Sequence, residues 1–164
     1  MLRRIKRWIS LSDGERSIVL AYIGVALFGA GLSFTVVNNL GGEDTILRTL
    51  TPYDYWVILS GALGAAVGLY FGGKWFGRAG WAGLRHGAVG LCVTTFAASV
   101  AAGTFALPGY GTMFGPFAAV LTFLESPLLL VFWVSILTAC HLLFATWRRE
   151  RDTLFAIHDD GIPT

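Results

Sequence analysis

Glu125 is the one acidic residue inside a long apolar stretch of this 164-residue sequence, and it is the first candidate for chemistry. A carboxylate at membrane depth is costly, so such a residue commonly serves as a proton relay, a cation site or a partner contact. Ser126 and Pro127 follow it and predict a helix start, because serine favours the N-cap and proline the first helical position. That break would move Glu125 to the membrane interface, where water could solvate it. A ligand or ion site and a purely structural role both stay open.

His86 and His141 could hold a haem or a chlorin through their imidazole nitrogens. Each lies toward the same end of the helix bundle that the apolar runs predict. Counting ~1.5 Å per residue, however, places the two rings several ångströms apart in depth. A hydrogen-bonded or interfacial histidine is the more common arrangement. We therefore predict no metal site, and haem or pigment binding is the weakest of three functional hypotheses.

The other motifs in the sequence do not indicate an enzyme. The run from Gly68 to Lys74 begins like a phosphate-binding loop, but Trp75 stands where that loop needs Ser or Thr to hold the metal. Serines within the apolar runs have no histidine and carboxylate at their depth, which a hydrolytic triad requires. We expect no catalytic activity.

The composition is that of a membrane protein. Hydrophobic residues make up 55% and charged residues 13% of the chain, against about 25% charged in an average soluble domain. The net charge of +2 gives no sign of nucleic-acid binding. The cysteines, Cys92 and Cys140, lie in separate apolar runs and are interpreted as buried free thiols. Membrane lipids must solvate most of the surface.

Basic residues are distributed unevenly between the gaps that separate the apolar runs. Eleven of the twelve Lys and Arg residues fall in alternate gaps, and only Arg48 lies in another. Such a bias sets orientation, with the basic segments in the cytoplasm. The sequence therefore predicts cytoplasmic N and C termini, with the bacterial inner membrane as the default location.

Four membrane spans follow from the apolar runs. The whole is an all-α domain over residues 18–147, and the expected spans are 18–37, 55–73, 87–107 and 127–147. Capping patterns support two starts: Ser12 with Glu15, and Thr51-Pro52 with Asp54.

Basic segments flank this domain. Residues 1–17 combine apolar positions at helical spacing with Arg3, Arg4, Lys6 and Arg7, which predicts an interfacial helix that contacts anionic lipid headgroups. Residues 148–164 form a basic cytoplasmic tail.

The apolar stretch before the last span is too short to cross a membrane. We expect Phe114 to Leu124 to form a half-inserted or interfacial helix on the outer side. The glycine-rich segment 108–116 before it is interpreted as a re-entrant turn or an interaction surface that presents Tyr110 and Phe114.

Small residues recur in the second span at Gly64, Gly68 and Gly72. Such spacing allows close helix approach in lipid. The glycines could pack against the third span or against another subunit.

The first functional hypothesis is a non-catalytic accessory, assembly or structural subunit of a larger membrane complex, with other membrane protein subunits as partners. The alternative is a small homo-oligomeric transporter or channel that uses Glu125.

Overall fold

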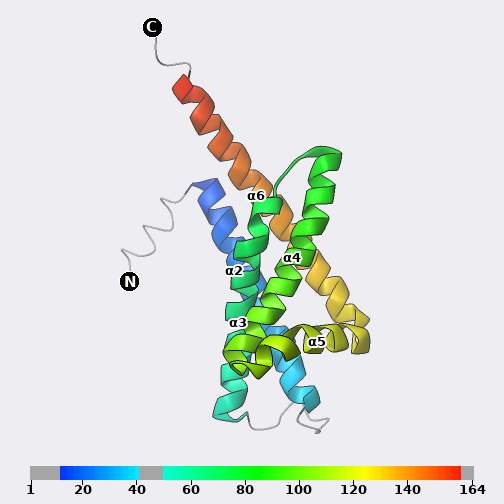
Figure 1. Ribbon diagram of the computed structural model, residues 1–164. Coiled ribbons are helices and arrows are strands. Elements are labelled where there is room, and N and C mark those ends of the chain that lie inside the picture. The colour runs from blue at the N-terminus through cyan, green and yellow to red at the C-terminus, as the bar shows by residue number, and fades with distance from the viewer. Residues whose placement is uncertain (1–11, 41–49, 160–164) are drawn as a thin grey trace, which may run out of the picture.

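The computed structural model describes the backbone of residues 12–40 and 50–159, and the side chains of 12–39 and 50–153. Most of the described residues lie in helices (Figure 1). In chain order, the helices are α2 (Asp13–Leu40), α3 (Pro52–Gly72), the short 3-10 helix η1 (Gly73–Trp75), α4 (Gly80–Ala106), α5 (Tyr110–Glu125) and α6 (Pro127–Asp159).

Four of these helices, α2, α3, α4 and α6, are long and apolar enough to cross a membrane. This confirms the prediction of an all-α integral membrane protein with four spans. The expected N-terminal interfacial helix, with Arg3, Arg4, Lys6 and Arg7, lies outside the described residues.

Local capping chemistry sets the helix starts. Ser12 Oγ accepts from the Glu15 N–H while Glu15 Oε2 accepts from the Ser12 N–H, both at 3.2 Å. Thr51 and Asp54 form the same reciprocal pair at the start of α3, and α6 begins at Pro127. The predicted capping box at Ser12, the predicted helix start at Thr51-Pro52 and the predicted break at Ser126-Pro127 are therefore confirmed.

The start of α2 and the last turns of α6 lie at the same end of the bundle (Figure 1). A carboxylate oxygen of Glu150 on α6 accepts a hydrogen bond from the Gly14 N–H, which joins the two helices there. Helices α2 and α4 both pack against α3 but scarcely touch one another. A core cluster centred on Val25, Leu69 and Leu137 ties α2, α3 and α6 together.

Glycine allows close backbone approach between α3 and α4. A Cβ atom added to Gly68 would lie 2.5 Å from the Thr94 carbonyl oxygen, and one added to Gly64 would lie 2.5 Å from the Ala102 nitrogen. Gly72 packs against the Thr94 side chain in the same way. Small residues at this contact bring the two helices together where larger side chains would hold them apart.

Helix α5 differs from the expected short helix and glycine-rich turn. It begins at Tyr110, so most of segment 108–116 is helical, and only Pro108-Gly109 remains as a turn. Gly111 packs backbone to backbone against Gly103 of α4. The glycines that suggested an irregular turn instead permit this close contact, and α5 runs across the bundle (Figure 1).

The third span also begins earlier than expected. Helix α4 starts at Gly80 rather than near residue 87, which leaves a connection of four residues, 76–79, after η1. Two glycines at this return, Gly77 and Gly80, have φ of +80° and +74°, a backbone conformation that favours glycine.

Candidate functional site

A pocket of about 530 Å³ lies between the helices, in the half of the bundle away from the start of α2 and the end of α6. All five long helices contribute to its wall, and most of the lining residues are Gly, Ala, Ser or Thr. The other lining residues are Tyr53, Asp54 and the larger apolar residues Leu32, Val36, Val37, Val57, Leu107, Phe114, Phe123 and Trp133.

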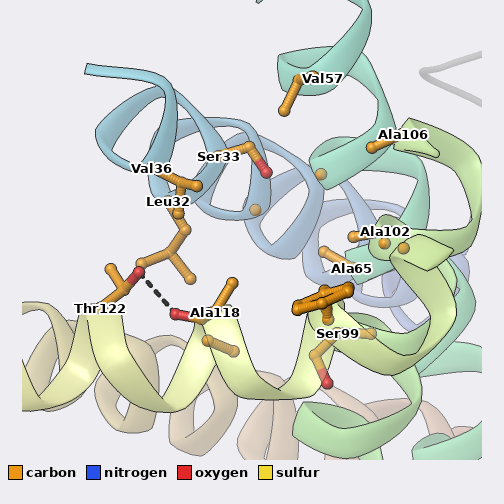
Figure 2. A pocket seen from close by; sticks show the side chains of 18 of the residues that line it. Leu32, Ser33, Val36, Val57, Ala65, Ser99, Ala102, Ala106, Ala118 and Thr122 are labelled. Carbon is orange, nitrogen blue, oxygen red and sulfur yellow. Dashed lines mark hydrogen bonds between the residues drawn. The ribbon is translucent and has the colours of Figure 1, made fainter. Parts of the chain in front are cut away.

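The pocket exists because α2 and α4 diverge on the two sides of α3, and α5 bridges the gap. Figure 2 shows Leu32 and Val36 of α2 facing Ala118 and Thr122 of α5 across this space. Ala65 and Ala102 lie on another side of it. Methyl groups at these positions are too short to fill the volume between the helices.

Several polar groups on the wall have partners within the protein. The Trp133 Nε1–H donates to Thr95 Oγ1 at 2.8 Å, and the Thr122 hydroxyl donates to the Ala118 carbonyl at 2.9 Å. Asp54 is only 7% exposed, and its carboxylate accepts the Thr51 N–H at 2.8 Å. The surface offered to a ligand is therefore mainly apolar.

The pocket extends along α3. Its wall includes Asp54 in the first turn of α3 and Ala65 eleven residues later. At a rise of ~1.5 Å per residue, the wall extends for roughly 16 Å along this helix. Trp133, which is 2% exposed, contributes to the wall from α6.

Glu125 is exposed and does not line the pocket. Its Oε2 accepts a 3.0 Å hydrogen bond from the Asn39 side-chain amide near the end of α2. The neighbouring residues Thr122 and Phe123 do reach the pocket wall. Glu125 therefore joins the end of α5 to the end of α2, next to the pocket.

The two histidines lie closer in depth than residue counting suggested. A Cβ atom on Gly87, the neighbour of His86, would lie 3.2 Å from the His141 ring. The difference arises because the count placed His86 in a loop before the third span, whereas α4 already includes it.

In both histidines, Nδ1 of the imidazole forms a hydrogen bond with a backbone group of the protein. His141 Nδ1 accepts from the Gly77 N–H at 3.3 Å, and His86 Nδ1 lies 2.6 Å from the Ala82 carbonyl oxygen. Within the described ranges, no group of three or more His, Cys, Asp or Glu side chains is placed to hold a metal ion.

The cysteines have different environments. Cys140 is buried, and its thiol lies 3.7 Å from the Ala21 carbonyl oxygen. Cys92 is exposed on α4, so the expectation that both are buried is wrong for this residue. Apolar neighbours in sequence do not distinguish a lipid-facing position from a core position in a membrane helix.

The remaining candidate residues are divided between two locations. Gly64, Gly68 and Gly72 lie at the contact with α4, inside the chain's own fold. Phe114 contributes to the pocket wall, whereas Tyr110, which is 75% exposed, does not. Sequence reasoning missed the pocket itself, although the alanines of the third span were a signal of low side-chain volume.

Comparison of this chain with protein-family models, with curated proteins and with solved structures finds no match.

Proposed function

We propose that this chain is a non-catalytic accessory subunit of the membrane that binds one apolar chain of a lipid-like molecule in the pocket between α2, α4 and α5. The observation that supports this most directly is a mainly apolar space of about 530 Å³ between the helices. Ligand pockets in proteins commonly have volumes of ~300–1,000 Å³.

The length of the pocket matches that of a lipid acyl chain from one leaflet of the bilayer. The wall extends for roughly 16 Å along α3 from Asp54, and half of a ~30 Å hydrocarbon core is ~15 Å. A long apolar chain in the pocket would contact the small and apolar side chains of its wall.

The polar groups of the pocket wall favour a pocket that binds a ligand over one that catalyses a reaction of that ligand. The hydroxyl of Thr122 and the indole N–H of Trp133 bond to groups of the protein itself, so neither is directed at a substrate. Such a pocket can hold or present an amphiphile within a larger membrane assembly, which is the accessory role inferred from the sequence.

Photocrosslinking tests the proposal. The purified full-length chain is reconstituted in vesicles of phosphatidylcholine that carries a photoactivatable, clickable acyl chain. We expect labelled peptides from α4 and α5 at the pocket wall. Replacing Ala118 by Phe fills space inside the pocket, so labelling of these peptides should fall at least fivefold.

Val120→Phe is the matched control, because Val120 lies on the same helix, is 56% exposed and does not line the pocket. It should label like the parent. Equal labelling of the parent and the Ala118 variant would show that the acyl chain contacts only the outer surface, and the proposal would then be wrong.

Transport through Glu125 is a second candidate, favoured by the exposed carboxylate that bonds Asn39 beside the pocket. An ion-flux assay in liposomes tests it with Glu125→Gln, which keeps an oxygen acceptor for Asn39 but removes the charge. Flux that disappears in the variant supports transport. Flux equal to that of the parent removes Glu125 from that role.

We also propose that both termini face the cytoplasm of a bacterial inner membrane. The support is the distribution of Lys and Arg along the sequence. A reporter that is active only in the periplasm can be fused to the C terminus of the chain. We expect the reporter to be inactive in this fusion. An active reporter would show that the C terminus faces the periplasm and would contradict the proposed orientation.

A further inference from the structure

Four basic side chains belong to one small region at the end of the bundle where α2 begins. Lys74 and Arg78 come from the connection between α3 and α4, and Arg148 and Arg151 come from α6. The region lies opposite to the half of the bundle that contains the pocket (Figure 1).

Direct contacts bring the two segments together. Arg148 Nη2 donates a 2.9 Å hydrogen bond to the Lys74 carbonyl oxygen. Gly77 lies against the backbone of α6, because a Cβ atom there would be 2.7 Å from the Phe144 carbonyl oxygen. The connection that carries Lys74 and Arg78 is therefore held against the helix that carries the two arginines.

Positive charge in this region exceeds negative charge. Arg78 and Arg151 both lie close enough to Arg148 to repel it electrostatically, and Asp152 is the acid that attracts it. Glu150 is also near, but its carboxylate accepts the Gly14 N–H at the start of α2. Arg148 Nε is buried and has no hydrogen-bond acceptor among the described residues.

Tryptophans place the cluster at headgroup level. The Arg151 guanidinium lies 4.7 Å from the ring centroid of Trp147, and Lys74 Nζ lies 4.1 Å from that of Trp75. Tryptophan concentrates at the boundary between hydrocarbon and headgroups. The cationic groups thus lie where lipid phosphates lie.

We propose that Arg78, Arg148 and Arg151, with Lys74, form a binding site for the phosphate of an anionic phospholipid. Guanidinium groups bind phosphate oxygens by paired, charge-assisted hydrogen bonds, and basic pockets between membrane helices bind lipid headgroups. A bound phosphate would offset the repulsion among the arginines. This site is separate from the apolar pocket and does not depend on its function.

Thermal unfolding of the full-length chain in a neutral detergent tests the site. The additives are phosphatidylglycerol, phosphatidylcholine and inorganic phosphate, each titrated separately. We expect phosphatidylglycerol to raise Tm in a saturable way and phosphatidylcholine to have no effect. In Arg148→Gln and in Arg78→Gln, the midpoint of the titration should move at least tenfold higher in lipid concentration.

Arg149→Gln is the matched control, because Arg149 is the next residue on α6 and is exposed. It loses the same charge and should respond to the lipid like the parent. The Arg78 variant keeps the test valid if Arg148→Gln fails to fold, since the Arg148 bond to Lys74 remains.

Three results would overturn the proposal. The first is an equal rise in Tm with phosphatidylcholine, and the second is an equal loss of response in the Arg149 control. The third is stabilisation by inorganic phosphate with no response to phosphatidylglycerol, which would assign the cluster to a soluble anion instead.

Discussion

The indole Nε1–H of Trp133 donates a 2.8 Å hydrogen bond to the hydroxyl of Thr95, and this bond joins α6 to α4 at the pocket wall. These two helices otherwise have few contacts. The Thr95 hydroxyl in turn donates to the Leu91 carbonyl at 2.8 Å, so its proton is directed away from the indole. Trp133 is thereby fixed in one orientation.

Replacing Thr95 by Val should destabilise the protein by about 1–3 kcal/mol, because the buried indole N–H loses its acceptor. Reversible unfolding in mixed micelles, followed by circular dichroism, measures the change. Thr138→Val is the control, since that exposed hydroxyl bonds only the Val134 carbonyl of its own helix. Equal losses in the two variants would contradict a special role for the bond between α6 and α4.

Gly68→Ala should lower stability by about 1–3 kcal/mol, as overpacking does in a close contact. The new methyl group would lie 2.5 Å from the Thr94 carbonyl oxygen and 2.7 Å from the Ala98 nitrogen. Both are backbone atoms, so α3 and α4 must separate to make room.

Gly31→Ala is the control for this change. A Cβ atom there meets nothing within 4 Å, and alanine favours a helix over glycine by up to ~1 kcal/mol. It should be neutral or stabilising in the same unfolding experiment. A Gly68 variant that unfolds like the Gly31 variant would show that the two helices are not packed as described.

Gly77→Ala should be more destabilising than Gly80→Ala. Both residues have positive φ, so each substitution carries a penalty of roughly 1–2 kcal/mol. At Gly80 the added methyl group meets nothing within 4 Å, whereas at Gly77 it would press against the Phe144 backbone. Thermal unfolding of the two variants side by side measures the difference, and equal values would mean that the connection is not held against α6.

Glu150→Ala should loosen the first turn of α2, because the Gly14 N–H loses an acceptor from another helix. A hydrogen bond to a charged group contributes about 1.5–3 kcal/mol. Hydrogen exchange of a peptide that covers residues 13–17 should therefore become faster.

Glu150→Gln separates the hydrogen bond from the charge. The amide oxygen can still accept from Gly14, so exchange should be slower in this variant than in Glu150→Ala. Exchange at the parent rate in Glu150→Ala would show that the Ser12 and Glu15 capping box alone holds this turn.

Helix starts could be predicted from the sequence because their causes are local. Ser12 with Glu15, and Thr51 with Asp54, lie three residues apart, and each pair forms the reciprocal bonds of a capping box. The four spans follow from apolar runs long enough to cross a bilayer. Neither inference requires knowledge of how the helices pack.

Helix α5 shows where local reasoning fails. Glycine at 111 and 115 suggests a flexible turn when only the sequence is considered. In the structure both residues lie against α4, at Gly103 and Ser99, where any larger side chain would collide with its backbone. Glycine occurs both in flexible turns and at close contacts between helices, and only the packing against α4 distinguishes the two cases here.

The pocket and the basic cluster could not be predicted for a related reason. Leu32 and Ala118 are 86 positions apart, and they face each other only because α2 and α4 pack on different sides of α3. Lys74 and Arg148 are likewise brought together by the docking of a connection onto α6. Such sites depend on tertiary geometry that no local pattern encodes.

Helix α6 runs without interruption from Pro127 to Asp159. At a rise of ~1.5 Å per residue, its far end lies roughly 39 Å along the axis from Trp133. One continuous helix therefore connects the indole that forms part of the pocket wall with the end of α6 that extends beyond the other helices (Figure 1).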